Sequence, residues 1–144
     1  MTTITYSALE DLLTLLHNNW GGSGDAGREP IFQKVWERRS VGFGSDRQEV
    51  ILLTPRQENI QYFGLHGDNF FHDLTVDLDI RSYHDEERHE VIVKEIIRII
   101  QANIRGSTTF PYTDLRIMSS HSRSEIMRNM YNHIISVSYR KTDP

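Results

Sequence analysis

Residues 70–106 read FFHDLTVDLDIRSYHDEERHEVIVKEIIRIIQANIRG, and this stretch decides the fold. Its first part alternates strictly, with apolar residues at positions 74, 76, 78 and 80 and polar residues at 75, 77, 79 and 81. A period of two is typical of a strand that buries one face. After Tyr83 the apolar residues recur at steps of three and four, which predicts an amphipathic helix that Gly106 ends. A strand followed by a helix on its apolar face predicts a two-layer α+β core.

The length and composition are those of one globular domain, and we expect a single α+β domain over residues 1–144. The longest apolar runs are only a few residues, so we expect no membrane span. The first five residues lack the pattern of a secretory signal, which predicts assembly inside a cell. The absence of cysteine excludes disulfides and thiolate metal sites. The net charge of −4 argues against broad nucleic-acid binding.

Weaker patterns supply the other elements. Ser7 and Glu10 have the spacing of a capping box at the start of a leucine-rich helix, which Gly21 and Gly22 end after Trp20. Further strands are expected at 31–38, 49–54, 60–63, 115–118 and 134–140, with a turn at 54–59. Short connections favour an antiparallel meander. The predicted fold class is α+β with two layers, a mostly antiparallel twisted sheet packed by two helices in the order α-β-β-β-β-α-β-β.

Two carboxylates are candidates for chemistry. Asp77 and Asp79 lie on the same face of the central strand, roughly 7 Å apart by strand rise. Such a pair could hold Mg²⁺ together with waters and a substrate phosphate. A nuclease built on this pair normally adds a Glu-x-Lys from the next strand, and the sequence contains none. The favoured interpretation is a solvated polar face or a protein contact.

Other motifs do not converge on a catalytic set. A single Glu-x-x-His, Glu86 to His89, falls short of the two copies that a di-iron bundle needs, and it better fits charge placed at a helix start. The glycine-rich residues 21–29 follow a helix rather than a strand, so they predict a mobile loop and not a phosphate cradle. The basic residues are scattered among acids, as on an ordinary solvated surface. We therefore predict no cofactor, no metal and no enzyme activity.

Aromatic residues are concentrated in or beside the expected loops, which include 64–72 and the ambiguous stretch 119–130. Apolar side chains on long loops favour surfaces that order against a partner. The residues of this kind are Phe43, Phe63, Phe70, Phe71, Phe110 and Tyr112. The sequence therefore predicts an assembly component.

The whole layout resembles the tail terminator, or tail completion, proteins of long-tailed bacterial and archaeal viruses. The similarity lies in the order of the elements and covers nearly the whole chain. It comprises the helix from Ser7 to Trp20, the meander opening at Pro30-Ile31-Phe32, the run from Leu74 to Ile80 leading into Ile92 to Ile104, and the final strands at 115–118 and 134–140.

This resemblance implies a ring, usually a hexamer, that caps the head-proximal end of the tail tube, stops its polymerisation and joins the head connector. The implied partners are further copies of the chain, the tail-tube protein, a connector or neck protein, and genome DNA passing through without sequence-specific binding. The implied location is the virion, after assembly in the host cytoplasm. Residues expected at interfaces or in the channel are Phe43, Phe70, Phe71, Asp77, Asp79, Arg81, Tyr139 and Arg140.

Three alternatives remain open at the level of sequence. The long loops leave room for a neighbouring role, as a head-closure protein or tail adaptor. Asp77 and Asp79 leave room for a metal-dependent nuclease. A small intracellular adaptor that binds one protein through its loops is the third.

Overall fold

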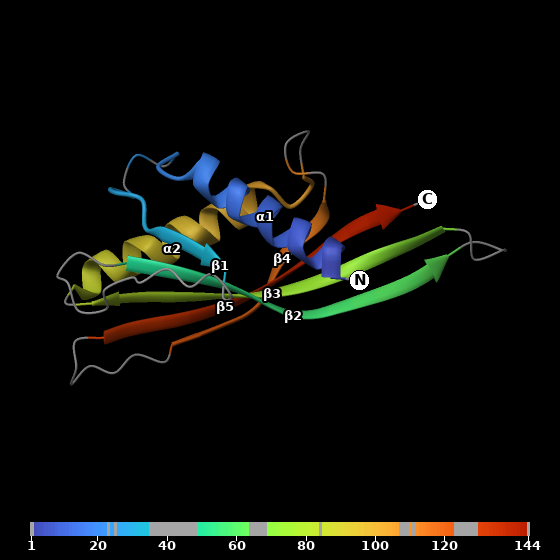
Figure 1. Cartoon of the computed structure of the whole chain (residues 1–144). Coiled ribbons are helices and arrows are strands. Elements are labelled where there is room, and N and C mark those ends of the chain that lie inside the picture. Colours follow the sequence, from blue (N-terminus) through green and yellow to red (C-terminus); the bar gives the residue numbers. More distant parts are fainter. Residues whose placement is uncertain are drawn as a thin grey trace.

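A computed structural model of the chain describes residues 2–22, 24, 26–34, 49–63, 69–83, 85–106, 110, 112–122 and 130–143. Two helices lie on one face of a five-stranded mixed sheet (Figure 1). The order is α1 (Thr2–Asn19), β1 (Ile31–Lys34), β2 (Glu49–Phe63), β3 (Asn69–Tyr83), α2 (Glu86–Ala102), β4 (Thr113–Ser122) and β5 (Met130–Asp143). The α+β class and the two-layer arrangement are as predicted.

The strands lie in the order β1-β2-β3-β5-β4. Three neighbouring pairs are antiparallel, but β1 runs parallel to β2, with Ile31 opposite Val50. The prediction of an antiparallel meander is therefore wrong for the connection between β1 and β2. A parallel pair needs a crossover of a dozen or more residues, and residues 35–48 provide that length. The predicted continuation of the first strand to Arg38 lies outside the described residues.

Among the described residues, three strands precede α2 rather than four, because 49–54 and 60–63 form one continuous strand. Residues 54–59, expected as a turn, stay in β2 with a register shift between Pro55 and Gln57. The partner strand β1 reaches only to Leu53, so Pro55 lies where no described strand pairs with the outer edge of β2. Proline is tolerated at such edges and bulges because its missing N–H breaks no ladder bond.

The alternation on β3 is confirmed by burial. Leu74, Val76, Leu78 and Ile80 are fully buried in the core, and the intervening residues are only half-buried. Burying each large apolar side chain contributes about 1.5–3 kcal/mol. The helices supply the opposite wall of the core with Ala8, Leu9, Leu12, Leu15, Leu16, Ile92, Ile96, Ile99 and Ile100.

Both helices differ from expectation at their ends. Helix α1 begins at Thr2, so Ser7 lies inside the helix and is not its N-cap. In α2 the N-cap is Asp85, whose carboxylate accepts a hydrogen bond from the backbone N–H of Arg88 at 3.1 Å. This helix ends at Ala102 rather than continuing to Gly106, and it leaves Ile104 47% exposed.

Gly106 is required by its backbone and by its surroundings. It has a φ of +71°, and a Cβ at this position would lie 2.1 Å from the carbonyl oxygen of Tyr112. Gly21 has a similar φ of +82°, but a Cβ there would meet nothing within 4 Å. Substitutions at these two glycines therefore distinguish the cost of a positive φ from the added cost of steric overlap.

We predict that Gly21→Ala lowers the free energy of unfolding by about 1 kcal/mol, the cost of a left-handed conformation. Gly106→Ala adds a backbone clash and should lower it by at least about 3 kcal/mol. Urea denaturation of both variants measures the difference. Equal losses in the two variants would mean that the close approach of Tyr112 does not constrain position 106.

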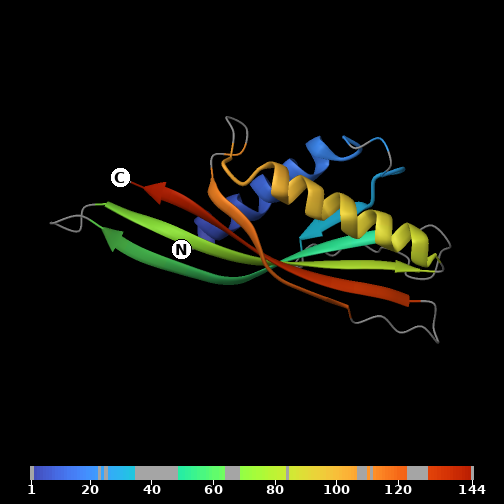
Figure 2. The same cartoon turned by 180° about the vertical axis from the view of Figure 1, so that it is seen from behind.

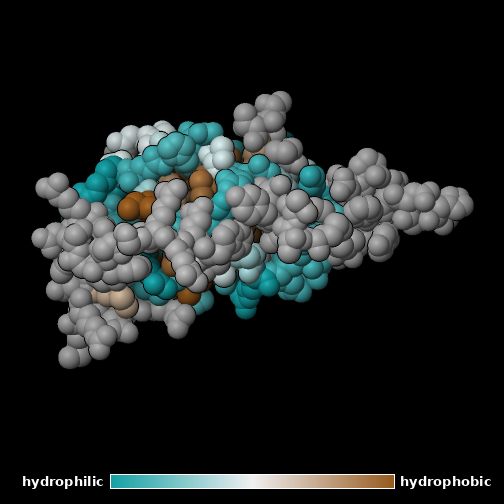
Figure 3. All heavy atoms as spheres, viewed as in Figure 1, coloured by the Kyte–Doolittle hydropathy of each residue, from teal (hydrophilic) through white to brown (hydrophobic). Residues whose placement is uncertain are grey.

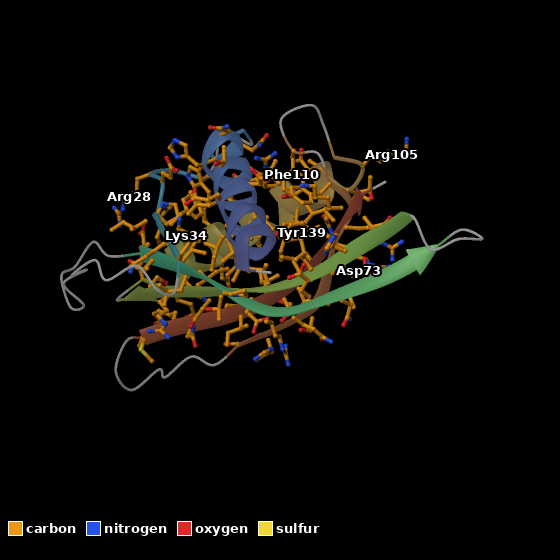
Figure 4. The ribbon with its side chains drawn as sticks, turned by 45° about the vertical axis from the view of Figure 1, so that its right-hand side comes forward. Arg28, Lys34, Asp73, Arg105, Phe110 and Tyr139 are labelled. Atoms are coloured by element: carbon orange, nitrogen blue, oxygen red, sulfur yellow. The ribbon has the colours of Figure 1, made fainter. Side chains whose placement is uncertain are left out.

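Three aromatic residues form a buried cluster under α1. Phe110 and Tyr112 were expected at an exposed loop, but both are buried beside Tyr139 of β5, with ring centroids 4.9–5.8 Å apart. Figure 4 shows Phe110 and Tyr139 together between the helices and the sheet. The Tyr139 hydroxyl donates to the carbonyl of Ala8 at 2.7 Å, and Tyr112 donates to Asp11 at 2.6 Å. Burial and the Asp11 hydrogen bond raise the pKa of Tyr112.

A partly buried ion cluster, centred on the buried carboxylate of Glu49, joins the segment after α1 to the sheet and to α2. Glu49, at the start of β2, accepts hydrogen bonds from Arg28 at 2.6 Å and from Arg88 at 3.0 Å. The Arg88 guanidinium also donates to the backbone carbonyls of Ala26 and Arg28. The carboxylate of Glu49 thereby neutralises the charges of two arginines that are far apart in the sequence.

We predict that Glu49→Gln lowers the free energy of unfolding by about 3 kcal/mol, because it leaves a buried guanidinium without its counter-charge. The control is Glu90→Gln, at an exposed position on α2, which should change stability by less than about 0.5 kcal/mol. Chemical denaturation at neutral pH provides the measurement. A loss no larger than that of the control would show that the cluster is not a stabilising contact.

The sheet extends beyond the helices at one end. Residues 59–63 of β2, 69–73 of β3 and 140–143 of β5 form this projecting arm, which Figures 1 and 2 show from opposite sides. The C-terminal end of β5 lies on the arm. The segment 119–122, ambiguous in sequence, completes β4, and residues 123–129 are outside the described part.

Candidate functional site

The open face of the sheet, on the side away from the helices, is the first candidate site. We define it by Asp73, Thr75, Asp77, Asp79 and Arg81 of β3 and by Asn132, Ile134, Ser136, Ser138 and Arg140 of β5. These residues alternate with the apolar core positions of the same strands, so the strand period places them together, and two of them, Asn132 and Ser136, are themselves buried. No described helix covers this face (Figures 1 and 2).

Hydrogen bonds across β3 and β5 fix the polar side chains of the open face. Arg140 binds Asp73 with two hydrogen bonds, of 2.6 and 3.1 Å, and this contact raises the arginine pKa. The hydroxyl of Ser136 donates to Asp77 at 2.5 Å. Asn132 donates to Asp79 and to the carbonyl of Ile80. The open face is therefore ordered before any partner arrives.

The charges of the open face are balanced. Asp79 accepts a 2.8 Å hydrogen bond from Arg81, and Asp77 lies 3.7 Å from the guanidinium of Arg56 on β2. Together with the Asp73–Arg140 pair, three carboxylates meet three arginines. Among the described residues, the face that carries Asp77 and Asp79 is thus ion-paired rather than simply acidic. Such a surface offers a polyanion neither strong attraction nor strong repulsion.

The geometry does not favour the nuclease alternative. Asp77 and Asp79 share a face, as predicted, but each carboxylate is held by its own arginine and by its own neighbour on β5. Within the described ranges, no three His, Cys, Asp or Glu side chains gather closely enough to hold a metal ion.

The remaining predicted interface residues fall in different places. Phe43 lies outside the described residues, and Phe70 and Phe71 belong to the first residues of β3, on the arm. Arg81 and Arg140 lie on the open face. Tyr139 does not, because it is 0% exposed and packs in the aromatic cluster. Its prediction as a contact residue is corrected: β5 alternation turns odd-numbered residues toward the helices.

A second candidate site is a pocket of about 520 Å³ beside α2, lined by Glu86, His89, Glu90, Val93, Lys94, Ser122, Tyr131 and His133. His89 is only 6% exposed, and its Nδ1 lies 2.6 Å from the hydroxyl of Ser82. Its ring centroid is 6.4 Å from that of His133. The spacing of the histidines in the sequence did not predict this contact. It forms because His89 lies on the side of α2 that faces the sheet and His133 lies on the side of β5 that faces the helices. Glu86 lies in the first turn of α2, as expected for dipole compensation.

The described lining of the pocket includes two histidines whose pKa values are lowered. Burial, and then the nearby His133, lower the pKa of His89 to about 4, while Glu90 acts in the opposite direction. The ring is therefore neutral at pH 7. Burial and His121 also lower the pKa of His133. The Nδ1 of His89 is paired with the hydroxyl of Ser82, whereas its buried Nε2 has no hydrogen-bond partner among the described residues.

This pKa shift predicts acid sensitivity. In the unfolded chain His89 gains a proton near pH 6.5, but in the folded chain only near pH 4. Stability is therefore complete above pH 6.5 and falls as the pH drops toward 4. Between pH 7 and 4.5 we expect His89 to account for a loss of about 2.5 kcal/mol.

Urea denaturation at pH 7 and at pH 4.5 measures this loss. The free energy of unfolding of His89→Gln should fall on acidification by about 2.5 kcal/mol less than that of the unaltered protein. The control is Gln101→Ala, at an exposed and non-titrating position of α2, which should retain the acid sensitivity of the unaltered protein. Identical pH dependence in the unaltered protein and His89→Gln would contradict the burial of a neutral imidazole.

The surface of the described residues is mostly hydrophilic in the view of Figure 3, with apolar colour in small separate spots. No described helix is long and apolar enough to cross a membrane. No protein-family model matches this sequence, and no curated protein matches it either.

Proposed function

We propose that this chain is a structural protein of a long-tailed virus, which forms a ring at the head-proximal end of the tail tube. In this role it ends tube polymerisation and joins the tail to the connector. The partners are other copies of the chain, the tail-tube protein and a connector or neck protein. It works in the virion without catalysis or cofactor.

The observation that carries the proposal is the one-sided sheet with its projecting arm. Helices cover one face and leave a polar, ion-paired face open, while 59–63, 69–73 and 140–143 extend beyond the core. A monomeric domain gains little from strands that reach past its hydrophobic core, because they bury little apolar surface. The same strands are well placed to contact neighbouring subunits.

The open face suits a channel for DNA. Its carboxylates and arginines are paired, so a passing duplex finds no row of free cations and releases few counterions on contact. A channel lined in this way lets the polyanion slide without holding it. A neighbouring neck position, as a head-closure or adaptor protein, would use the same ring and the same lining.

The direct test is the size of the assembly. Native mass spectrometry and negative-stain electron microscopy, with the protein alone and mixed with tail tubes, should show a ring of about six copies, the closed cyclic form that a head-to-tail interface permits. Added protein should also shorten tubes that polymerise in its presence. A lasting monomer that never joins tube ends would refute the proposal.

A charge substitution tests the channel lining. Asp77→Lys places unpaired positive charge on the open face, and its ring should bind duplex DNA at least about tenfold more tightly at low salt, with binding lost as salt rises. Glu90→Lys makes the same change in net charge on the helical side and should bind no better than the unaltered ring. Fluorescence anisotropy with labelled duplex measures both. Equal gains would mean that the open face does not line the channel.

A further inference from the structure

The pocket beside α2 lies between the first turns of that helix and the start of β5. Strand β3 ends at Tyr83, α2 begins at Glu86, and β5 starts with Met130 opposite Tyr83. The beginnings of α2 and β5 therefore lie at the same end of the molecule (Figures 1 and 2). The pocket has a volume of about 520 Å³, which falls within the roughly 300–1,000 Å³ that is typical of small-molecule sites.

Three rings line this pocket, one from the helix and two from the sheet. Tyr131 is opposite Ser82 and His133 is opposite Ile80, so both rings belong to the side of β5 that faces the helices. The centroids of these two rings lie 5.8 and 6.4 Å from that of His89 on α2. The pocket therefore offers flat apolar surface to a ligand that is itself flat.

The charges of the described lining are unequal. Glu86, Glu90 and Lys94 follow one another at steps of four along α2, so they share the face of the helix that lines the pocket. All three are exposed, and none of them has an ion-pair partner among the described residues. Glu95 on the same helix differs, because it is paired with Arg98. Two unpaired carboxylates and one unpaired ammonium group leave the described lining with an excess of negative charge.

The buried imidazole of His89 is a second and independent observation. This residue is only 6% exposed, and its Nε2 has no hydrogen-bond partner among the described residues. A buried polar atom without a partner is rare, and a water, an ion or a ligand usually satisfies it. When Nδ1–H donates to the hydroxyl of Ser82, Nε2 carries a lone pair that accepts a hydrogen bond. Burial lowers the pKa of His89 to about 4, so the ring adds no positive charge at pH 7.

These features select one class of ligand. An anion meets two carboxylates, with Lys94 as the single counter-charge in the described lining. A metal ion needs several ligating groups, and the described residues do not bring three suitable side chains together. An organic cation fits better, because its N–H groups donate both to carboxylates and to an imidazole lone pair. The faces of aromatic rings also attract cations.

We propose that this pocket binds a small organic cation, in which an amidinium or guanidinium group is carried on a flat apolar ring. Glu86 and Glu90 bind the cationic group, and Nε2 of His89 accepts one of its N–H groups. The apolar ring packs against Tyr131 and His133. Because Nε2 is itself buried, the imidazole turns slightly toward the ligand when it binds. The site is separate from the open face of the sheet and does not depend on the proposed function.

Benzamidine is the probe, because its amidinium group is flat and positively charged at pH 7. In a titration of the intact chain followed by NMR, the ring resonances of His89, Tyr131 and His133 should shift and saturate with a dissociation constant of about 1 mM or lower. The ¹⁵N resonance of His89 Nε2 should also move, since this atom gains a hydrogen bond. Benzamide and benzoate carry a neutral and a negative group on the same ring, and each should bind at least about tenfold more weakly.

Substitutions of exposed charges on α2 test how the cation is held. Glu90→Gln should weaken benzamidine binding about fivefold, whereas Lys94→Gln should strengthen it about twofold by removing a competing cation. The matched control is Glu87→Gln, which makes the same change in charge at an exposed position outside the described lining and should leave the dissociation constant unchanged. Because these positions are exposed, all three variants should keep the stability of the unaltered protein within about 0.5 kcal/mol.

Several outcomes would overturn the proposal. Benzoate binding more tightly than benzamidine would indicate an anion site at Lys94, and equal binding of benzamidine and benzamide would mean that the carboxylates take no part. An equal loss of affinity in Glu87→Gln and Glu90→Gln would place the cation outside the pocket. Tighter binding of Nα-acetylarginine amide than of benzamidine would replace the small flat ligand by an arginine of a protein partner. The absence of saturable shifts up to about 20 mM benzamidine would exclude the site altogether.

Discussion

The structure depends on the burial of one face of β3 against the helices. Leu74, Val76, Leu78 and Ile80 belong to one core cluster with residues of both helices, and both neighbouring strands pair in register with β3. Because side chains alternate with a period of two, burying this set forces the aspartates between them to the other side. The core and the open face are thus two consequences of one constraint.

The polar contacts then decide which parts of the molecule are rigid. Glu49 ties the segment around Arg28 to α2, and the hydroxyl of Tyr139 ties β5 to α1. On the open face, charged pairs bridge adjacent positions rather than projecting into solvent. A surface ordered in this way has a fixed shape, so contact with another molecule would cost little side-chain entropy.

Where the sheet extends beyond the helices, the interactions that hold its strands together change. Over the core, strands are held by apolar burial; along the arm they are held by backbone pairing between β2, β3 and β5. The edge of β2 there lies past the end of β1, and the bulge at Pro55 marks the transition.

The sequence alone determined the α+β class, the strand at 74–80 and the amphipathic face of α2, because these follow from local periodicity. It also placed Asp77 and Asp79 on one face. The tertiary structure decided that Pro55 continues a strand, that β1 is parallel, and that Phe110, Tyr112 and Tyr139 are core residues. It also decided that Asp77 meets Arg56 of β2 and that Asp79 meets Asn132 of β5. Those outcomes depend on which distant segments become neighbours, and no local pattern of residues encodes that.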